Sequence, residues 1–299
     1  MKLIKSSYKI IPQEAGLEGI YKAIERAGRT CYKLEDKITD TSAKEFVDRM
    51  IKSGHNAMLE FGTIYLKCPI SVYYVECGEV EETDNPLDSY LDNSYSKGIE
   101  VWNQDKSKKG YCYITTNLRV LVENNWLEDL QYICEPTEHH ERRVHVKFVT
   151  DRGISHELVR HRVFSFAQES TRYCNYSRDK FDNQITFIQP SWIILDKEMA
   201  PINELCLLAG QYDRENPNLR YLASLVDANY TYISLLNKGW TPQQARDVLP
   251  NALKTEINMC GFTSDWKHFF ELRDSEKAHP DMQVLAKDLH DQFVTTKYI

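Results

Sequence analysis

The stretch VHVKFVTDRGISHELVRHRVFSFAQESTRY, residues 144–173, decides the fold because a strand pattern, a break and a helix pattern follow one another in it. From Val144 to Phe148, apolar residues alternate with other residues at a period of two, which predicts a strand. Asp151-Arg152-Gly153 breaks that pattern, and a short helix is predicted to start at Ser155. This strand-to-helix junction leads into the densest group of polar side chains in the chain.

Residues 160–173 form that polar group. They include three arginines, a histidine, two serines and a glutamine. Three arginines against one glutamate leave a fixed charge of +2, within a chain whose net charge is -7. Guanidinium groups bind phosphate through paired hydrogen bonds, and hydroxyls add neutral donors. Composition alone leaves two interpretations open: a site for a phosphate-bearing ligand, or a surface salt-bridge cluster that pairs with an acidic segment.

The first 62 residues have a helical pattern. Apolar residues recur on one face from Leu17 to Ile24, and Gly28 is placed to end that helix. Ser42 and Glu45 match a capping box at the start of a second helix, which Gly54 ends.

Beyond Thr63 the pattern changes to a strand, which is predicted from Ile64 to Val72. Residues 79–142 are interpreted as an insertion with some helix of its own at Leu118–Leu130. Its acidic run is read as a solvated face rather than a cation site, since carboxylates alone lack a coordination pattern. Later elements are a strand at Ile185–Ile188 and helices at 203–213, 218–237, after the cap Thr241-Pro242-Gln243-Gln244, and from Met282 to Phe293.

Length and pattern together predict the architecture. The chain has 299 residues, of which 42% are hydrophobic, and single cores stop growing at about 250–300 residues. We therefore expect an α+β fold: a twisted, mainly antiparallel sheet flanked by helices, in a single domain over residues 1–299 with an insertion at about 79–142.

Charge and cysteine content exclude several classes of protein. A net charge of -7 disfavours a nucleic-acid polymer or an anionic membrane as partner. The N-terminus lacks the apolar core of a signal peptide, and no stretch approaches the ~20 apolar residues of a membrane span, so we expect a cytoplasmic location. Eight cysteines, none spaced as CxxC, are too few for a disulfide scaffold, and we expect reduced thiols and no metal site.

The spacing within residues 160–173 adds a resemblance. The pattern RHRxxSxxxxSxRY resembles the signature of the flavin-dependent thymidylate synthases. Four further segments are similar to that family in the same order, and the resemblance runs from about residue 20 to 290, broken by the insertion. They are Arg29-Thr30-Cys31-Tyr32, Gly54-His55 with Glu60, Ala245-Arg246-Asp247-Val248-Leu249-Pro250, and Phe270-Glu271-Leu272-Arg273.

The resemblance implies an activity and its partners. The reaction is reductive methylation of dUMP to dTMP, in which methylenetetrahydrofolate donates the one-carbon unit, FAD carries the hydride and NADPH re-reduces the flavin. The resemblance also implies a homotetramer with active sites at subunit interfaces. Two alternatives remain: a nucleotide-binding homologue that has lost turnover, and an enzyme that attaches a hydroxymethyl group to dUMP.

Site residues follow from the same resemblance. Arg273 would stabilise negative charge on the uracil ring, and Ser170 would donate a hydrogen bond to the nucleotide. Cys174, just after the motif, is interpreted as structural because no Cys/His pair is evident. The residues implied to contact FAD are His55, Ala57, Glu60, Arg160, His161, Arg162, Gln168 and His268. Those implied to contact dUMP are Glu157, Arg160, Gln168, Glu169, Ser170, Thr171, Arg172, Tyr173, Arg246 and Arg273.

One corner of the site departs from the family. Phe262 and Ser264 stand where the family usually has an Asn-x-Arg pair that contacts FAD. Asn117-Leu118-Arg119, within the insertion, is a similar tripeptide that would compensate if it folds back.

Overall fold

The central sheet of the molecule combines strands from both ends of the chain. The computed structural model describes residues 1–74, 80–83, 85–104, 109–178, 181–194 and 204–299. Within those ranges the central sheet is antiparallel, and β10 lies between two partners from the middle of the sequence. In spatial order its strands are β2 (Ser7–Ile11), β7 (Arg143–Asp151), β10 (Lys254–Phe262) and β8 (Ser165–Gln168).

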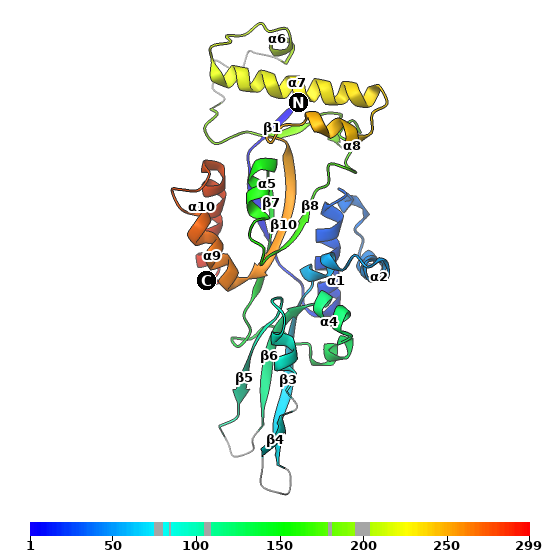
Figure 1. The fold of residues 1–299 in the computed structure, drawn as a ribbon, viewed down its shortest axis with the longest axis vertical. Helices are drawn as coiled ribbons and strands as arrows, with labels where there is room; N and C mark the ends of the chain where they lie inside the picture. Colours follow the sequence, from blue (N-terminus) through cyan, green and yellow to red (C-terminus); the bar gives the residue numbers. More distant parts are fainter. Residues whose placement is uncertain (75–79, 84, 105–108, 179–180, 195–203) are drawn as a thin grey trace.

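One face of this sheet is apolar and the other is largely polar. Phe148 lies opposite Ile257 in the register, and both belong to the hydrophobic core on the first face. Trp266 is fully buried in that core and donates from its indole Nε1 to the Val144 carbonyl at 3.1 Å. The helices that cover this face are α5 (Arg152–Leu158), α9 (Thr263–Arg273) and α10 (Pro280–Thr295). The opposite face contacts α1 (Gly16–Thr30), as Figure 1 shows.

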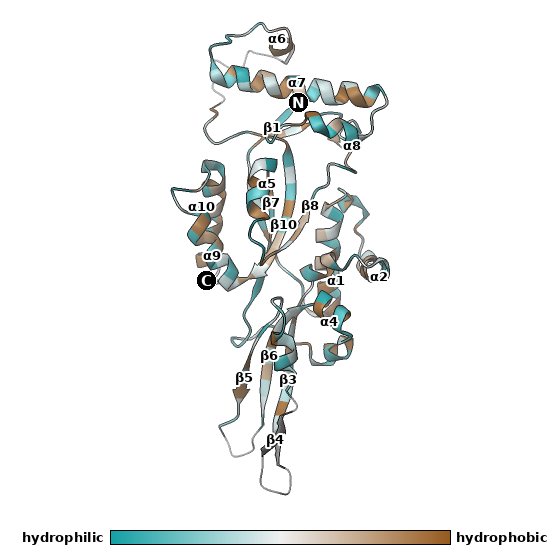
Figure 2. Cartoon of the chain, in the orientation of Figure 1, coloured by the Kyte–Doolittle hydropathy of each residue, from teal (hydrophilic) through white to brown (hydrophobic). Residues whose placement is uncertain are grey.

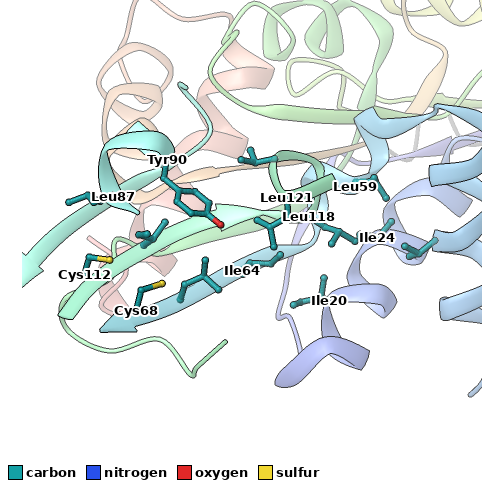
Figure 3. Close-up of a cluster of buried hydrophobic side chains, with 14 of the residues drawn as sticks. Ile20, Ile24, Leu59, Ile64, Cys68, Leu87, Tyr90, Cys112, Leu118 and Leu121 are labelled. Carbon is teal, nitrogen blue, oxygen red and sulfur yellow. The ribbon is translucent and has the colours of Figure 1, made fainter. Parts of the chain in front are cut away.

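A second antiparallel sheet extends the molecule away from the first (Figure 1). Its strands, in spatial order, are β4 (Val80–Thr83), β3 (Thr63–Tyr74), β6 (Lys109–Asn117) and β5 (Lys97–Trp102). Side chains from this sheet pack with α1, α2 (Ser42–Ser53), α3 (Leu87–Leu91) and α4 (Leu118–Asn124) in one core (Figure 3). The segment interpreted as an insertion therefore adds its strands to β3 and shares a core with the N-terminal helices.

The third part of the fold lies at the opposite end of the molecule. Figure 2 shows hydrophobic and hydrophilic residues along the whole length of its main helix, α7. This part contains β1 (Lys2–Ile4), paired in parallel with β9 (Thr186–Ile188), together with α6 (Glu204–Leu208), α7 (Pro217–Asn237) and α8 (Pro242–Ala245). No helix in the described ranges combines the length and the apolar character needed to cross a bilayer.

The structure confirms a mixed helix-and-sheet fold with antiparallel sheets. It corrects the expectation of one sheet, because the described ranges hold two four-stranded antiparallel sheets and the two-stranded parallel sheet β1–β9. The expectation that the first 62 residues are helical is wrong at the start, where β1 and β2 form. The helix predicted at 203–213 is also too long. Residues 201–203 lie outside the described residues, and α6 ends at Leu208 before Gly210, whose φ is 68°.

Several predicted helix ends also change. Gly28 lies inside α1, where a Cβ would come within 2.5 Å of the Phe46 ring, so the glycine permits close helix packing. The Ser42 hydroxyl accepts from the Thr39 N–H at 2.9 Å and caps no helix. Helix α5 starts at Arg152, not Ser155, because the Asp151 carboxylate accepts the Ile154 N–H at 2.9 Å. Gly54, with φ of 70°, ends α2 as predicted.

Candidate active site

Arg273 meets two of the predicted site residues at the end of α9. Its Nη1 donates to Glu157 Oε2 at 2.6 Å, and its Nε donates to His161 Nε2 at 2.9 Å. Its Nη2 also donates to the Glu157 carbonyl, at 3.2 Å. All three donor positions are therefore fixed by the residues that end α5 and follow it.

His161 is the neutral member of this group. Burial, and then the nearby guanidinium of Arg273, lower the pKa of His161 to about 4. Its ring packs 5.1 Å from the Phe269 ring, which holds the imidazole against α9. At neutral pH its Nε2 therefore serves as an acceptor for Arg273, and the remaining proton lies on Nδ1.

Arg160 and Arg162 flank His161 and are both exposed. Within the described part of the chain, neither guanidinium is paired with a carboxylate. Two unpaired guanidinium groups beside a buried neutral histidine form a donor set suited to an anionic group.

Open space lies on the other side of α5. A cavity of about 290 Å³ is lined by Glu157, Asp151, Tyr221 and His279, among others. Glu157 thus has Arg273 on one side and a cavity on the other, so a ligand can reach it.

Gln168 and Glu169 point to opposite sides of the central sheet. The Gln168 Nε2 donates to Ser155 Oγ at 2.8 Å and to Thr255 Oγ1 at 3.2 Å, on the side of α5. Glu169 is only 2% exposed and accepts from the Tyr176 hydroxyl at 3.0 Å. Successive residues of an extended chain alternate in direction, which explains the separation.

The loop that follows, residues 170–173, is held by segments distant in sequence. The Ser170 N–H donates to the Cys31 carbonyl at 2.9 Å, and the Tyr173 ring lies 5.1 Å from the Tyr32 ring. Of these four residues, Tyr173 is 57% exposed. The segment 29–32, matched to the family by sequence, therefore contacts the main motif directly.

Two arginine side chains lie at the loop 170–173: Arg172, which belongs to it, and Arg246, which comes from a distant segment. Arg246, which begins the 3₁₀ turn Arg246–Val248, donates from Nη1 to Thr171 Oγ1 at 3.3 Å. Arg172 is exposed and donates from Nε to Gln243 Oε1, also at 3.3 Å. Both contacts are long, so both guanidinium groups can turn toward an anion at the loop.

The predicted flavin residues near the N-terminus lie on the turn Asn56–Phe61 or, for His55, directly before it. His55 and Ala57 are exposed, whereas Glu60 is buried and is paired with Arg119 Nη1 at 2.5 Å. Asn117 does not reach outward, because its side chain accepts the Arg119 N–H at 3.0 Å and caps α4. Of the tripeptide Asn117-Leu118-Arg119, only the arginine therefore contacts a predicted flavin residue, Glu60.

Lys97 of β5 and Glu141, just before β7, surround Phe262 and Ser264. The Lys97 ammonium lies 4.6 Å from the centre of the Phe262 ring and donates to Ser264 Oγ at 2.5 Å. Glu141 pairs with Lys97 at 3.0 Å. His268, predicted to retain a flavin contact, is exposed and lies 3.3 Å from the Glu271 carboxylate.

Most of the predicted residues therefore form three groups in one chain, and Arg160, Arg162, Gln168, Glu169 and His268 lie outside these groups. No side-chain hydrogen bond or ion pair between described residues joins one group to another. Cys174 is buried in a hydrophobic cluster below the loop. The groups are Glu157, His161 and Arg273; Ser170, Thr171, Arg172, Tyr173 and Arg246; and His55, Ala57 and Glu60.

Sequence reasoning missed the residues that hold these groups in place. Ser155 and Thr255 anchor Gln168, and Gln243 contacts Arg172. None belongs to the family motif, although Gln243 lies in the helix cap Thr241-Pro242-Gln243-Gln244. One sequence pattern does bear on Thr255. In Lys254-Thr255-Glu256, a strand would place the two charged residues on one face and Thr255 on the other.

Comparison with known proteins identifies the family. The family model described as thymidylate synthase complementing protein, Thy1, matches residues 107–296. A flavin-dependent thymidylate synthase from Mycolicibacterium vanbaalenii is 35% identical over 144 residues, covering 48% of this chain and 54% of that protein. The chain spans about half the length of the curated relatives it matches.

Two solved structures are also similar. The UMP/dUMP methylase PolB from Streptomyces cacaoi aligns with a TM-score of 0.42 and 15% identity, over 99% of this chain and 93% of that one. Thymidylate synthase X from Helicobacter pylori, in complex with FAD and dUMP, aligns with a TM-score of 0.37 and 17% identity, over 96% and 91%. Because the Thy1 model matches more than half of the sequence, including the whole charged segment 160–173, the chain belongs to the Thy1 family of flavin-dependent thymidylate synthases.

Proposed function

We propose that this protein reductively methylates dUMP to dTMP, with methylenetetrahydrofolate as one-carbon donor, FAD as hydride carrier and NADPH as reductant. The observation that carries the proposal is the contact of Arg273 with Glu157 and His161, beside the unpaired Arg160 and Arg162. A permanently charged guanidinium held by neighbours stabilises negative charge that develops on a substrate ring. No cysteine nucleophile is needed in this scheme.

The nucleotide would bind across the loop 170–173 and the Arg273 group. Arg172 and Arg246 would hold the phosphate, and the hydroxyls of Ser170 and Thr171 would donate to the phosphate and sugar. Arg273 would polarise the N3–C4 edge of uracil, with Glu157, Arg160 and Gln168 completing the pocket.

The donor set fits FAD. Arg160 and Arg162 are exposed guanidinium groups suited to its anionic diphosphate, and neutral His161 lies between them in sequence. His55, Ala57, Glu60 and His268 would complete the flavin contacts. FAD, when bound, supplies the hydride that reduces the transferred one-carbon unit. The protein's own residues orient the nucleotide and hold the charge of its ring.

The direct test is an absorbance spectrum followed by a product assay. We expect the purified protein to be yellow and to form dTMP from dUMP with reduced flavin and methylenetetrahydrofolate. Tight dUMP binding without flavin absorbance, even after reconstitution, would favour the nucleotide-binding homologue, which the filled corner at Phe262 and Ser264 supports. A product mass heavier by one oxygen than that of dTMP would identify a hydroxymethylase.

Arg172→Ala should mainly weaken dUMP binding, because it removes a phosphate partner. We expect the dUMP dissociation constant to rise about tenfold to a hundredfold in calorimetry, consistent with the ~1.5–3 kcal/mol of a charged hydrogen bond. Arg178→Ala, an exposed arginine beyond the loop, is the control. An unchanged dissociation constant would remove Arg172 from the pocket.

Arg119→Ala should lower FAD affinity about tenfold, because Glu60 loses the guanidinium that fixes its carboxylate. FAD fluorescence quenching measures the change without turnover. Lys44→Ala, which breaks an exposed pair with Asp48, should leave the affinity unaltered. Equal affinities for both variants would show that Arg119 does not compensate for Phe262 and Ser264.

We also propose a cytoplasmic homotetramer whose active sites are shared between subunits. The separation of the predicted residues into three groups within one chain supports it. At a dUMP concentration too low to saturate Arg172→Ala, Arg273→Ala and Arg172→Ala should each be much slower than wild type, and activity should rise when the two are co-expressed and co-purified, since mixed assemblies contain some intact sites. Absence of activity in mixed assemblies of verified composition would show that both arginines serve a site from the same chain.

A further inference from the structure

Six charged side chains gather on the α1 side of the central sheet, next to the loop 170–173. They come from the segment after α1, from β7, from β10 and from the residue after β8. Three are lysines and three are glutamates, so their charges balance. We call the set the charge network: Lys33, Glu35, Lys147, Glu169, Lys254 and Glu256.

Glu256 is the centre of the charge network. Its carboxylate lies 2.6 Å from the Lys254 ammonium, 2.7 Å from that of Lys33 and 2.5 Å from that of Lys147. Burial opposes the charged form of Glu256, but the three ammonium groups outweigh it and hold its pKa well below the usual range. The centre is therefore ionised at neutral pH.

Glu169 joins the charge network to the loop. Lys254 contacts its Oε2 at 2.9 Å, and the Tyr176 hydroxyl donates to its Oε1 at 3.0 Å. Its backbone N–H donates to the Glu256 carbonyl at 2.8 Å. Both carboxylate oxygens are engaged by the protein, and the residue is only 2% exposed.

From these contacts we infer that Glu169 is a positioning residue for the nucleotide-binding loop and does not itself touch dUMP. The inference rests on the proposed function, because it assigns a role within that site. It also names Lys254 and Tyr176 as the partners through which Glu169 acts.

The geometry explains how the positioning works. Lys33 belongs to the same segment as Cys31 and Tyr32, which hold Ser170 and Tyr173. The loop 170–173 therefore contacts the segment that contains Cys31, Tyr32 and Lys33 in two ways. One is direct, and the other runs through the charge network. Fixing the loop before the ligand arrives lowers the ordering cost of binding.

The experiment compares Glu169→Gln with wild-type full-length protein. We expect the dUMP dissociation constant in calorimetry to rise about tenfold, while kcat at saturating dUMP and the FAD affinity stay within twofold. Lys254→Arg keeps the charge and should bind dUMP almost as wild type does. Glu35→Gln is the matched control, since Glu35 is in the charge network but 34% exposed and distant from the loop in sequence. It should leave the dissociation constant within twofold.

If Glu169→Gln does not fold, the double variant Glu169→Gln/Lys254→Met removes both charges of the pair and should fold while binding dUMP weakly. Wild-type dUMP affinity in either folded Glu169 variant would overturn the inference, as would a fall in kcat with no change in affinity. An equal loss of affinity in Glu35→Gln would also overturn it. Wild-type protein that does not bind dUMP would instead refute the proposed function.

Discussion

Arg273→Ala should lower kcat about 10²–10³-fold while changing the dUMP dissociation constant less than threefold. The guanidinium is proposed to act on charge that develops in the reacting ring, so its removal affects the transition state more than the bound substrate. Single-turnover dTMP formation gives the rate, and calorimetry gives the affinity. Equal losses in rate and in binding would contradict the assigned role.

Two further variants show whether charge or geometry at Arg273 matters. Arg273→Lys retains the positive charge but cannot contact Glu157 and His161 together, so we expect an intermediate rate. Lys267→Ala, an exposed residue on the same helix, should have wild-type kinetics. A slow Lys267→Ala variant would mean that α9 is sensitive to any change on its surface.

Glu256→Gln should destabilise the protein by about 3–5 kcal/mol, the usual cost of removing one partner from a buried ion pair. Lys254, Lys33 and Lys147 would then face one another with too few carboxylates nearby. Urea unfolding at pH 7 measures the loss. Asp48→Asn, which removes a carboxylate from an exposed pair, is the control and should cost less than about 1 kcal/mol.

The stability loss in Glu256→Gln should depend on pH. The folded-state pKa of Glu256 is lowered, so its contribution to stability is fully present above the unfolded pKa of about 4.5 and is lost as pH falls toward the folded value. The difference in unfolding free energy between wild type and Glu256→Gln should therefore shrink as pH falls below about 4.5. A difference that stays constant down to pH 3 would show that the lysines do not hold the carboxylate charged.

Local patterns predicted much of the fold. The strand at Val144–Phe148 was predicted correctly because its alternation matches a sheet with one apolar face. The start of α8 was also predicted, and its Thr241 N–H does donate to Gln244 Oε1, at 3.0 Å. The central strand β10 was missed, because Lys254 and Glu256 give it the composition of a surface segment. Their burial depends on lysines from distant parts of the sequence, which no local pattern contains.

The motif gave candidate residues but not their neighbours. It could not show that Gln168 and Glu169 lie on opposite sides of the sheet, since that depends on where β8 ends. It also could not place Lys97 beside Phe262, because that contact joins residues more than 160 positions apart.

The strand order has a consequence for synthesis of the protein. The second sheet uses residues 63–117 and can close from contiguous chain while translation continues. The central sheet cannot, because β10 separates β7 from β8 and ends at Phe262. Its strands therefore have to wait with unpaired edges until most of the chain has left the ribosome, which makes this step slow and prone to aggregation. A message truncated before residue 254 should yield a nascent chain that engages chaperones, with the second sheet already folded.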